Sequence, residues 1–201
     1  MIGIQGATGP LYRAHVKLPR YRVKITHVGL TGYAGAGKDA AAEALVADGW
    51  RRDAFADRMR AGLLALDPWV DQAGCPLSDL VAACGWDMAK RSYSDVRGLL
   101  QRFGTEAGRA IHGEDVWVDA LFRTIELGQR VVITDVRFDN EAEAIAGWYG
   151  IVIEIRRPGC GPVNGHASDA GISPDLIDFV VVNDGTVADL HAKIREVVGS
   201  A

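Results

Sequence analysis

The chain has 201 residues, of which 48% are hydrophobic, so it is long and apolar enough for one domain with a sizeable core. Its formal net charge of −4 argues against a protein that coats nucleic acid, because neutralising many phosphates requires a basic surface. The three cysteines lack paired or metal-binding spacing, and no apolar run approaches the roughly 20 residues that cross a bilayer, so we expect a cytoplasmic protein without membrane contact.

The first 22 residues are rich in Gly and Pro and lack helix or strand periodicity, so we expect a flexible N-terminal extension over 1–22 before a single domain over 23–201. The domain begins with a β-prone run over 23–31, a glycine-rich loop and an alanine-rich helix over 38–47. A short strand over 51–55 and a helix over about 57–66 follow. The glycines and prolines between 67 and 90 predict an irregular segment with short helices.

The second half of the chain continues to alternate helices and strands. Helices are predicted from residue 95 and over about 115–127, before a strand over 130–134 whose apolar residues are typical of a strand covered on both faces. Asn140 and Glu143 have the spacing of a capping box and are expected to open the next helix. Strands follow over 151–155 and 179–182. Thr186 and Asp189 begin the last helix in the same way, and its apolar stripe is Val187, Leu190, Ile194 and Val197.

This alternation predicts an α/β fold in which helices cover both faces of a doubly wound parallel sheet of about five strands, giving three layers. The segments over 67–90 and 157–175 are too long for simple connections between such elements. We therefore expect them to contribute to function.

The loop after the first strand fits the pattern GxxxxGK from Gly32 to Lys38, with a strand before it and a helix after it. Its glycines allow backbone N–H groups to turn inward around phosphate oxygens, and the following helix adds the positive end of its dipole. The lysine would reach the β- and γ-phosphates. The sequence therefore predicts a nucleotide site made of Gly32, Ala34, Gly35, Ala36, Gly37, Lys38 and Asp39.

The position after the lysine departs from the full pattern, which has Ser or Thr there as a ligand of Mg²⁺. Asp39 and Ala40 supply no hydroxyl. Asp135, at the end of the apolar strand over 130–134, has the place of a carboxylate that holds Mg²⁺ beside such a loop. Because Mg²⁺ keeps several waters readily, we expect it to bind Asp135 through water, with Asp39 as the alternative ligand.

Several segments, in chain order over about 23–198, resemble the phage-type deoxynucleoside monophosphate kinases, a family of P-loop kinases. The most specific is DVRFDNEAE over 135–143, which is similar to the family signature DVRFxNEAE. In two segments the chain departs from the family, with Ala40 in place of a Thr and Asp169 in place of a Glu. The other similar segments are GLTGYAGAGKDAAA over 29–42, FADRMR over 55–60, LLQRFGTEAGR over 99–109 with Trp117, HASD over 166–169 and NDGT over 183–186.

The resemblance implies transfer of the γ-phosphoryl group of ATP to a deoxynucleoside monophosphate with Mg²⁺, in the host cytoplasm if the protein is phage-encoded. It implies Lys38, Asp135 and Arg137 as catalytic residues and a lid over 157–175, which Arg156 and Arg157 begin and which closes over ATP. A homodimer is compatible with the sequence. The residues expected at the acceptor are Arg60, Arg97, Arg109 and Arg137 for phosphate, and Gln101, Thr105, Glu106 and Trp117 for the base or sugar.

Two alternatives remain open from the sequence. Another small-molecule P-loop kinase, acting on dephospho-coenzyme A or phosphomevalonate, would share the loop and the carboxylate at the strand end. A nucleotide-binding regulatory protein would share the loop but would not respond to a phosphoryl acceptor. The three readings differ in which molecule, if any, stimulates release of ADP.

Overall fold

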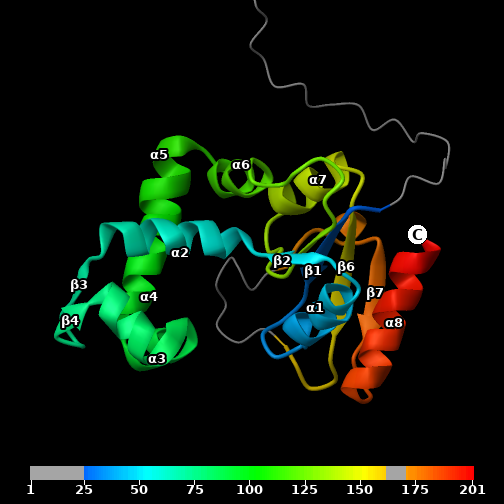
Figure 1. Ribbon diagram of the computed structural model, residues 1–201, viewed down its shortest axis with the longest axis horizontal. Coiled ribbons are helices and arrows are strands. Elements are labelled where there is room, and N and C mark those ends of the chain that lie inside the picture. Colours follow the sequence, from blue (N-terminus) through cyan, green and yellow to red (C-terminus); the bar gives the residue numbers. More distant parts are fainter. Residues whose placement is uncertain (1–24, 162–170) are drawn as a thin grey trace, which may run out of the picture.

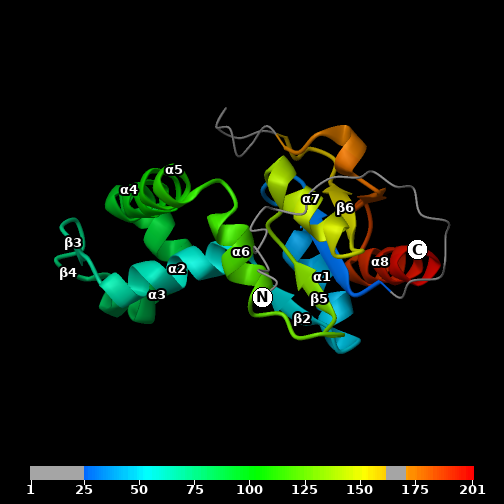
Figure 2. The ribbon, with the colours of Figure 1, turned by 90° about the horizontal axis from the view of Figure 1, so that it is seen from above.

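The computed structural model describes residues 25–161 and 171–201, which form an α/β lobe and a helical lobe side by side (Figures 1 and 2). The predicted extension over 1–22 and the central part of the predicted lid lie outside these residues. Within the described part of the chain, no helix is both long and apolar enough to cross a membrane.

The α/β lobe is built on a five-stranded sheet in which every neighbouring pair is parallel. The strand order is β2-β5-β1-β6-β7, so the chain starts at the centre of the sheet and winds outward in both directions. This confirms the predicted doubly wound sheet. The strands are β1 (His27–Thr31), β2 (Arg51–Asp53), β5 (Val131–Ile133), β6 (Ile151–Arg156) and β7 (Phe179–Val182).

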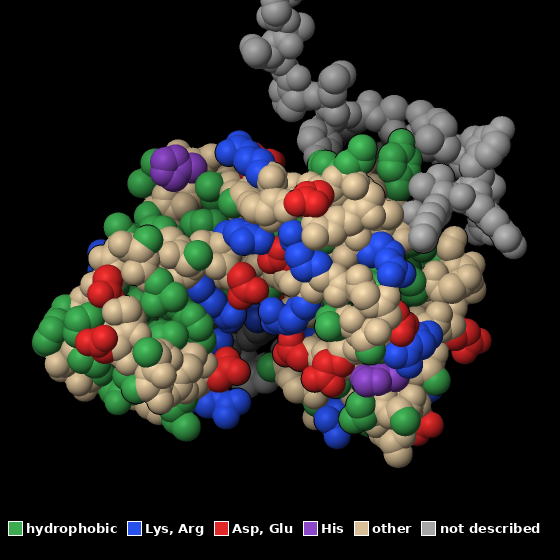
Figure 3. Space-filling view, viewed as in Figure 1, with side chains coloured by type: hydrophobic (Ala, Val, Ile, Leu, Met, Phe, Trp, Pro, Cys, Tyr) green, Lys and Arg blue, Asp and Glu red, His purple; other side chains and the backbone are tan. Residues whose placement is uncertain are grey.

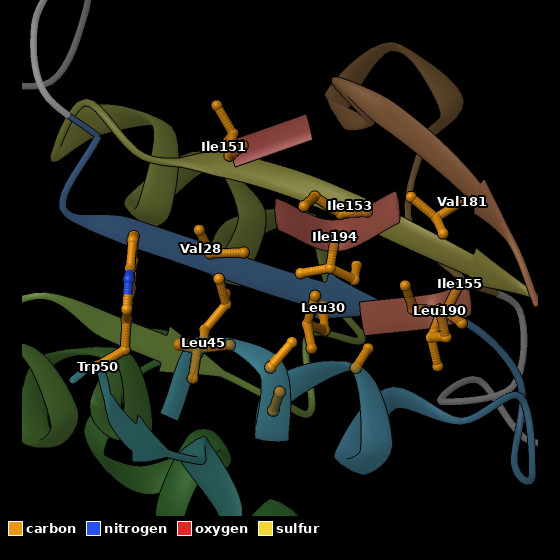
Figure 4. Close-up of a cluster of buried hydrophobic side chains, with 14 of the residues drawn as sticks. Val28, Leu30, Leu45, Trp50, Ile151, Ile153, Ile155, Val181, Leu190 and Ile194 are labelled. Atoms are coloured by element: carbon orange, nitrogen blue, oxygen red, sulfur yellow. The ribbon is translucent and has the colours of Figure 1, made fainter. Parts of the chain in front are cut away.

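Helices cover both faces of the sheet, which confirms the three layers. On one face, α1 (Lys38–Ala47) and α8 (Val187–Ser200) pack against β1 and β6 through a cluster that includes Leu30, Leu45 and Ile194 (Figure 4). On the other face, α6 (Val116–Phe122) and α7 (Asp139–Gly147) pack against β5 through a second cluster. Strands β1 and β5 are buried along their whole length, as expected for strands covered on both faces, whereas the edge strand β2 consists of charged residues.

The helical lobe is inserted between β2 and β5 and has its own apolar cluster around Leu63, Val70 and Leu77. Its chain leaves the sheet along α2 and returns through α6 (Figure 2). Both connections therefore lie on the side of the sheet formed by β2 and β5. The remaining elements are α2 (Phe55–Leu66), β3 (Trp69–Val70), β4 (Cys75–Pro76), α3 (Leu77–Ser92), α4 (Ser94–Gln101), the π-helical η1 (Arg102–Arg109) and α5 (Ala110–His112).

Several predicted boundaries in and near the helical lobe are wrong. The segment over 67–90 holds a small antiparallel hairpin and then α3, which is bent at Gly85, where φ is 74°. The helix predicted over 115–127 ends at Phe122, and the one predicted from residue 57 begins at Phe55. The helical lobe also contains a π-helix, η1, that a 3.6-residue periodicity does not predict.

The predicted caps of the last two helices had different outcomes. Thr186 and Asp189 form the predicted capping box of α8, since each side chain accepts the other residue's backbone N–H, at 3.2 and 2.9 Å. In the apolar stripe of α8, Leu190 and Ile194 are buried, whereas Val187 is exposed. Asn140 does not cap α7, because that helix already begins at Asp139. Its amide instead donates to Glu114 and Asp115.

Substitution of a buried leucine in the central strand should destabilise the protein far more than the same substitution on the surface. Leu30 is fully buried, whereas Leu66, at the end of α2, is 66% exposed. We expect Leu30→Ala to lower the free energy of unfolding by about 2–5 kcal/mol in urea titrations. Leu66→Ala is the matched control, with an expected change within about 0.5 kcal/mol. Similar losses in both variants would contradict this placement of the core.

Candidate functional site

The loop between β1 and α1 requires glycine at the positions that shape it. Gly32 has a φ of 130°, and a Cβ there would collide with the carbonyl oxygen of Ile155 on β6. Gly35 and Gly37 also have positive φ values, 78° and 102°. These conformations strain other residues and turn successive N–H groups toward one side, which is the arrangement that binds phosphate.

Lys38, the first residue of α1, lies across its own loop. Its Nζ donates to the carbonyl oxygens of Gly32 at 2.7 Å and Tyr33 at 3.0 Å. Burial, and next the nearby Arg137 guanidinium, lower the pKa of Lys38, whereas the carboxylates of Asp39 and Asp135 raise it. The loop therefore holds an ammonium group at its mouth. Phosphate oxygens would replace the two carbonyl oxygens as its hydrogen-bond acceptors.

Asn183, just after β7, fastens the loop to the far side of the sheet. Its side-chain amide donates to the carbonyl oxygen of Ala36 at 2.8 Å. It also fills the space where a Cβ on Gly37 would lie. The sequence indicated a turn at 183–186 but not this role, because the contact joins residues 147 positions apart.

A cavity of about 230 Å³ lies at the mouth of the loop. It brings together five of the predicted site residues, namely Gly32, Ala34, Lys38, Arg137 and Arg156. Gly35, Ala36 and Gly37 belong to the same loop, whereas Arg157 is exposed and does not line the cavity. Three of the other lining residues, Gly171, Ile172 and Pro174, lie within the predicted lid over 157–175. The sequence did not identify the remaining ones, which are Thr31, Tyr33, Val136, Glu154 and Ile177.

Asp135 is close to the loop, and its carboxylate caps helix α2. Its two oxygens accept the backbone N–H groups of Phe55 and Ala56 at 2.8 and 2.9 Å. The residue at the N-cap position is Ala54, which has no side-chain acceptor, so a residue from β5 takes over this role. Burial raises the pKa of Asp135, while the two N–H groups and Arg137 lower it. This tertiary cap also explains why α2 begins before the predicted residue.

Asp39 does not line the cavity, and its side chain is 81% exposed. Its carboxylate lies 3.4 Å from Arg52 of β2, and the same guanidinium lies 3.3 Å from Asp57 of α2. Among the described residues, no three His, Cys, Asp or Glu side chains are grouped so that they could hold a metal ion. A magnesium ion would therefore take most of its ligands from phosphate and water, as Mg²⁺ commonly does.

Positive side chains gather where the helical lobe meets the α/β lobe (Figure 3). Arg60 of α2 pairs with Asp57 at 2.9 Å and lies 5.8 Å from the ring centre of Trp86. Deeper in the joint, Asp53 is buried and binds Arg58 and Arg51 at 2.6 and 2.9 Å. The sequence indicated Arg60 alone of these arginines.

The other predicted acceptor residues lie in the helical lobe, and the structure does not bring them together around one cavity. Arg97, Gln101, Thr105 and Glu106 are exposed, and Glu106 is 3.9 Å from Arg102 on the same turn. Trp117 packs beside Phe103 and donates its indole N–H to the carbonyl oxygen of Gly104 at 2.9 Å. It therefore supports the π-helical segment from behind.

Arg109 is held by partners within the protein. Its Nη2 lies 2.8 Å from Glu141 Oε1, and its guanidinium lies 4.0 Å from the ring centre of Phe138. The arginine side chain is 12% exposed and the glutamate 3%. Burial raises the pKa of Glu141 to about 7, against the opposing effect of the Arg137 and Phe138 N–H groups and of Arg109.

Comparison with known proteins identifies one family. The model of the deoxynucleotide monophosphate kinases matches residues 82–194. A protein of Acanthamoeba polyphaga mimivirus named for this activity is 29% identical over 198 residues, which cover 87% of this chain and 96% of the viral protein.

Two phage deoxynucleotide monophosphate kinases match a shorter part of the chain. The enzyme of Escherichia phage RB69 is 29% identical over 108 residues, and that of Enterobacteria phage T4 is 30% identical over 105. These matches cover 51% and 50% of this chain but only 44% of each phage enzyme.

Similar solved structures include a dephospho-CoA kinase from Campylobacter jejuni, with 13% identity and a TM-score of 0.45, and TT1252 from Thermus thermophilus, with 18% identity and a TM-score of 0.40. Each comparison covers 89% of this chain and 98% of the other. The sequence similarities, rather than these likenesses, decide the family.

Removal of the Asp135 carboxylate should destabilise the fold, because it leaves two N–H groups at the start of α2 without an acceptor. We expect Asp135→Ala to lower the free energy of unfolding by about 1–2 kcal/mol. Asp39→Ala, which removes an exposed carboxylate at the same loop, should change it by less than about 0.5 kcal/mol. If urea titrations show equal stability for the two variants, the cap contributes nothing to the fold.

Proposed function

This chain belongs to the deoxynucleotide monophosphate kinase family, and from this premise we propose that it transfers the γ-phosphoryl group of ATP to a deoxynucleoside monophosphate. The observation that supports the proposal best is the cavity that Lys38, at the start of α1, and Arg137, in the segment after β5, line together with the glycine loop. Two anionic phosphates approach each other in such a reaction, so cations on both sides are what the chemistry requires.

The reaction needs positioning and charge stabilisation more than acid–base chemistry. An acceptor phosphate is already largely dianionic at neutral pH, since its second pKa is near 6, so no general base is needed. We assign Lys38 and the loop N–H groups to the β- and γ-phosphates of ATP. Arg137 would contact the transferred group from the opposite side of the cavity. Transfer then breaks the bond from the γ-phosphorus to the bridging oxygen of ADP and forms one to an oxygen of the monophosphate.

The acceptor would lie between the lobes, and the cations there are its proposed ligands. Arg60 pairs with Asp57, which also contacts Arg52 of β2, so Arg60 is near the contact between the lobes. Arg97 is exposed and has no ion pair among the described residues. Arg156 lines the cavity and Arg157 follows it, so we assign both to ATP and to the start of the lid. A closed lid would exclude water, which would otherwise accept the phosphoryl group.

Recognition of the base and sugar is assigned to the exposed side of the helical segment over 101–106. Gln101, Thr105 and Glu106 are exposed there. Glu106 has only a long, exposed ion pair, so it is free to form other contacts. The assignment of Trp117 is weaker in the structure than in the sequence, because its ring and N–H are already used for packing.

We propose that Mg²⁺ accompanies ATP and neutralises charge on the β- and γ-phosphates. The residues present fit an ion that keeps most of its waters. Asp39 is exposed beside the loop, and each oxygen of Asp135 accepts one N–H and retains a lone pair for a bound water. The contacts that Asp39 and Asp135 make within the protein are satisfied without a directly bound ion.

The proposal is tested by measuring ADP release from ATP with each common deoxynucleoside and ribonucleoside monophosphate, and with dephospho-coenzyme A and phosphomevalonate. We expect strong stimulation by at least one deoxynucleoside monophosphate and weaker stimulation by its ribonucleotide. An unpaired buried hydroxyl costs about 1–3 kcal/mol, which corresponds to about one or two decades of selectivity. EDTA should abolish the reaction, and Mg²⁺ should restore it.

The same assay separates the alternatives. Turnover with dephospho-coenzyme A or phosphomevalonate, and none with a monophosphate, would place the chain with another class of small-molecule kinases. Slow hydrolysis of ATP that no acceptor stimulates would indicate a nucleotide-binding regulatory protein. Activity that persists without a divalent ion would contradict the magnesium proposal.

Replacement of the loop lysine should remove activity without unfolding the protein. We expect Lys38→Ala to lower kcat by at least about 10²-fold, because the lysine contact is strongest when charge shifts toward the bridging oxygen. Lys90→Ala is the control, since Lys90 pairs with Asp87 on the surface of α3 and should be dispensable. A Lys38→Ala variant that folds and keeps near wild-type kcat would remove Lys38 from the mechanism.

A further inference from the structure

Glu141, in the first turn of α7, is a buried carboxylate. Its polar contacts are with Arg109 and Arg137, which the sequence predicted to bind phosphate, and with Phe138, the residue after Arg137. Its Oε2 accepts the backbone N–H of Arg137 at 2.8 Å and that of Phe138 at 3.2 Å. Its Oε1 accepts from Arg109 Nη2 at 2.8 Å. Only 3% of the side chain is exposed, so these contacts replace water almost completely. A buried carboxylate requires such partners, and each of them is therefore held firmly.

Arg109 approaches this carboxylate from the other lobe. It is the last residue of η1, and its guanidinium lies between Glu141, the ring of Phe138 and, 3.7 Å away, the exposed Glu114. Withdrawing Arg109 to bind a substrate phosphate would leave Glu141 buried without its cation, which is a costly state. The contact geometry thus favours a fixed Arg109 over one that moves to a ligand.

The backbone held by Glu141 is that of Arg137. This arginine lies four residues after the end of β5, lines the cavity with Lys38, and has its own N–H and the next one fixed by one carboxylate oxygen. Since a side chain leaves the backbone in a direction set by that backbone, fixing two successive N–H groups aims the Arg137 side chain at the cavity.

We propose that Glu141 is a positioning residue. It orients Arg137 toward the transferred phosphoryl group, and its ion pair with Arg109 connects this orientation to the helical lobe. The proposal rests on the kinase function proposed above. It assigns Arg109 an indirect role: the guanidinium anchors the carboxylate that orients Arg137 and does not itself bind the acceptor phosphate. A change in the position of η1 on acceptor binding would then reach Arg137 through one ion pair.

The charge of Glu141 matters for this role, and it titrates in the range where enzymes work. Burial, together with the nearby Asp135 carboxylate, raises the pKa of Glu141 to about 7 against the lowering effect of the Arg137 and Phe138 N–H groups and of the Arg109 guanidinium. Glu114 faces the same guanidinium from the connection to α6. Only the ionised form pairs with Arg109, so the orientation of Arg137 should weaken as the pH falls through about 7.

The test compares Glu141→Gln with Glu143→Gln, an exposed glutamate two positions later on the same helix. Steady-state kinetics with a monophosphate that the wild type accepts would be measured from pH 6 to 9, with folding checked by thermal unfolding. At pH 8 we expect Glu141→Gln to lose about 10-fold or more in kcat, with the KM for ATP changed less than about threefold. Glu143→Gln should match the wild type.

Two further measurements separate positioning from general structural support. The wild-type kcat should fall on the acid side with a midpoint near pH 7, and this limb should be missing from Glu141→Gln but present in Glu143→Gln. Arg109→Met should reproduce the kcat loss, and the double variant should lose little more than either single variant, because both act through one contact. If Glu141→Gln does not fold, Glu141→Asp, which keeps the charge with a shorter reach, should retain the acid limb with a lower kcat.

Three outcomes would overturn the proposal. Arg109→Met could raise the KM for the monophosphate while Glu141→Gln leaves kcat and this KM unchanged, which would make Arg109 a direct ligand. The losses in the double variant could simply add, or the acid limb could persist in Glu141→Gln. Failure of the kinase proposal looks different, because then the wild type itself transfers no phosphoryl group to any monophosphate.

Discussion

Two carboxylates in the segment after β5, the half-buried Asp135 and the buried Glu141, hold the helical lobe against the phosphate loop. Asp135 accepts the first N–H groups of α2, where the chain leaves the sheet, and Glu141 binds Arg109 at the end of η1. A carboxylate removed from water is costly unless it is paired and hydrogen-bonded, so each of them restricts its partner to one position. The segment between them includes Arg137. This short piece of chain thus contributes both to the placement of a lobe of more than fifty residues, together with the pair of Asp53 and Arg58, and to the position of Arg137 at the cavity.

In this arrangement the phosphate loop and Arg137 belong to the α/β lobe, whereas most of the residues proposed for the acceptor belong to the helical lobe. The loop is rigid: Gly32 lies against the backbone of β6, and Asn183 fastens Ala36 to the end of β7. A second substrate must enter and a second product must leave, which requires one side of the site to be less rigid than the other. The helical lobe meets the sheet through connections and ion pairs, whereas the helices of the α/β lobe share its apolar clusters. It is therefore the part best suited to move.

The sequence predicted the elements that depend on local patterns and on the alternation of strands and helices. The helix over 38–47, the strand over 179–182 and the capping box at Thr186 agree with the structure, because their signals lie within a few residues. The start of α2 and the cap of α7 were predicted wrongly, since the first depends on Asp135 from another strand and the second on Glu141 rather than Asn140. Hydrogen bonds over 79 or 80 positions leave no local pattern. For the same reason the sequence indicated the glycine loop, Lys38 and Arg137, which a motif identifies, but not the contact of Asn183 with Ala36 or the pairing of Glu141 with Arg109, which join residues 147 and 32 positions apart. The contacts of Glu141 with the N–H groups of Arg137 and Phe138 are local, and the sequence missed them because it placed the cap at Asn140.

The ion pairs of the site differ in burial, and this difference separates cations that can bind substrate from those that hold the fold. Arg52 with Asp39 and Arg156 with Glu154 are pairs with at least one well-exposed partner, and Asp57, the partner of Arg60, is 34% exposed. Such pairs contribute only about 0–1 kcal/mol, so a phosphate can replace the carboxylate at little cost. The pairs of Arg109 with Glu141 and of Arg58 with Asp53 have a carboxylate that is at most 7% exposed, and removing the cation would leave a buried negative charge. An arginine that supports a site and an arginine that binds at it look the same in a motif. Burial of the partner carboxylate distinguishes them, and on this basis we propose that Arg60 and Arg156 bind substrate, whereas Arg58 and Arg109 belong to the framework that holds the substrate-binding arginines in place.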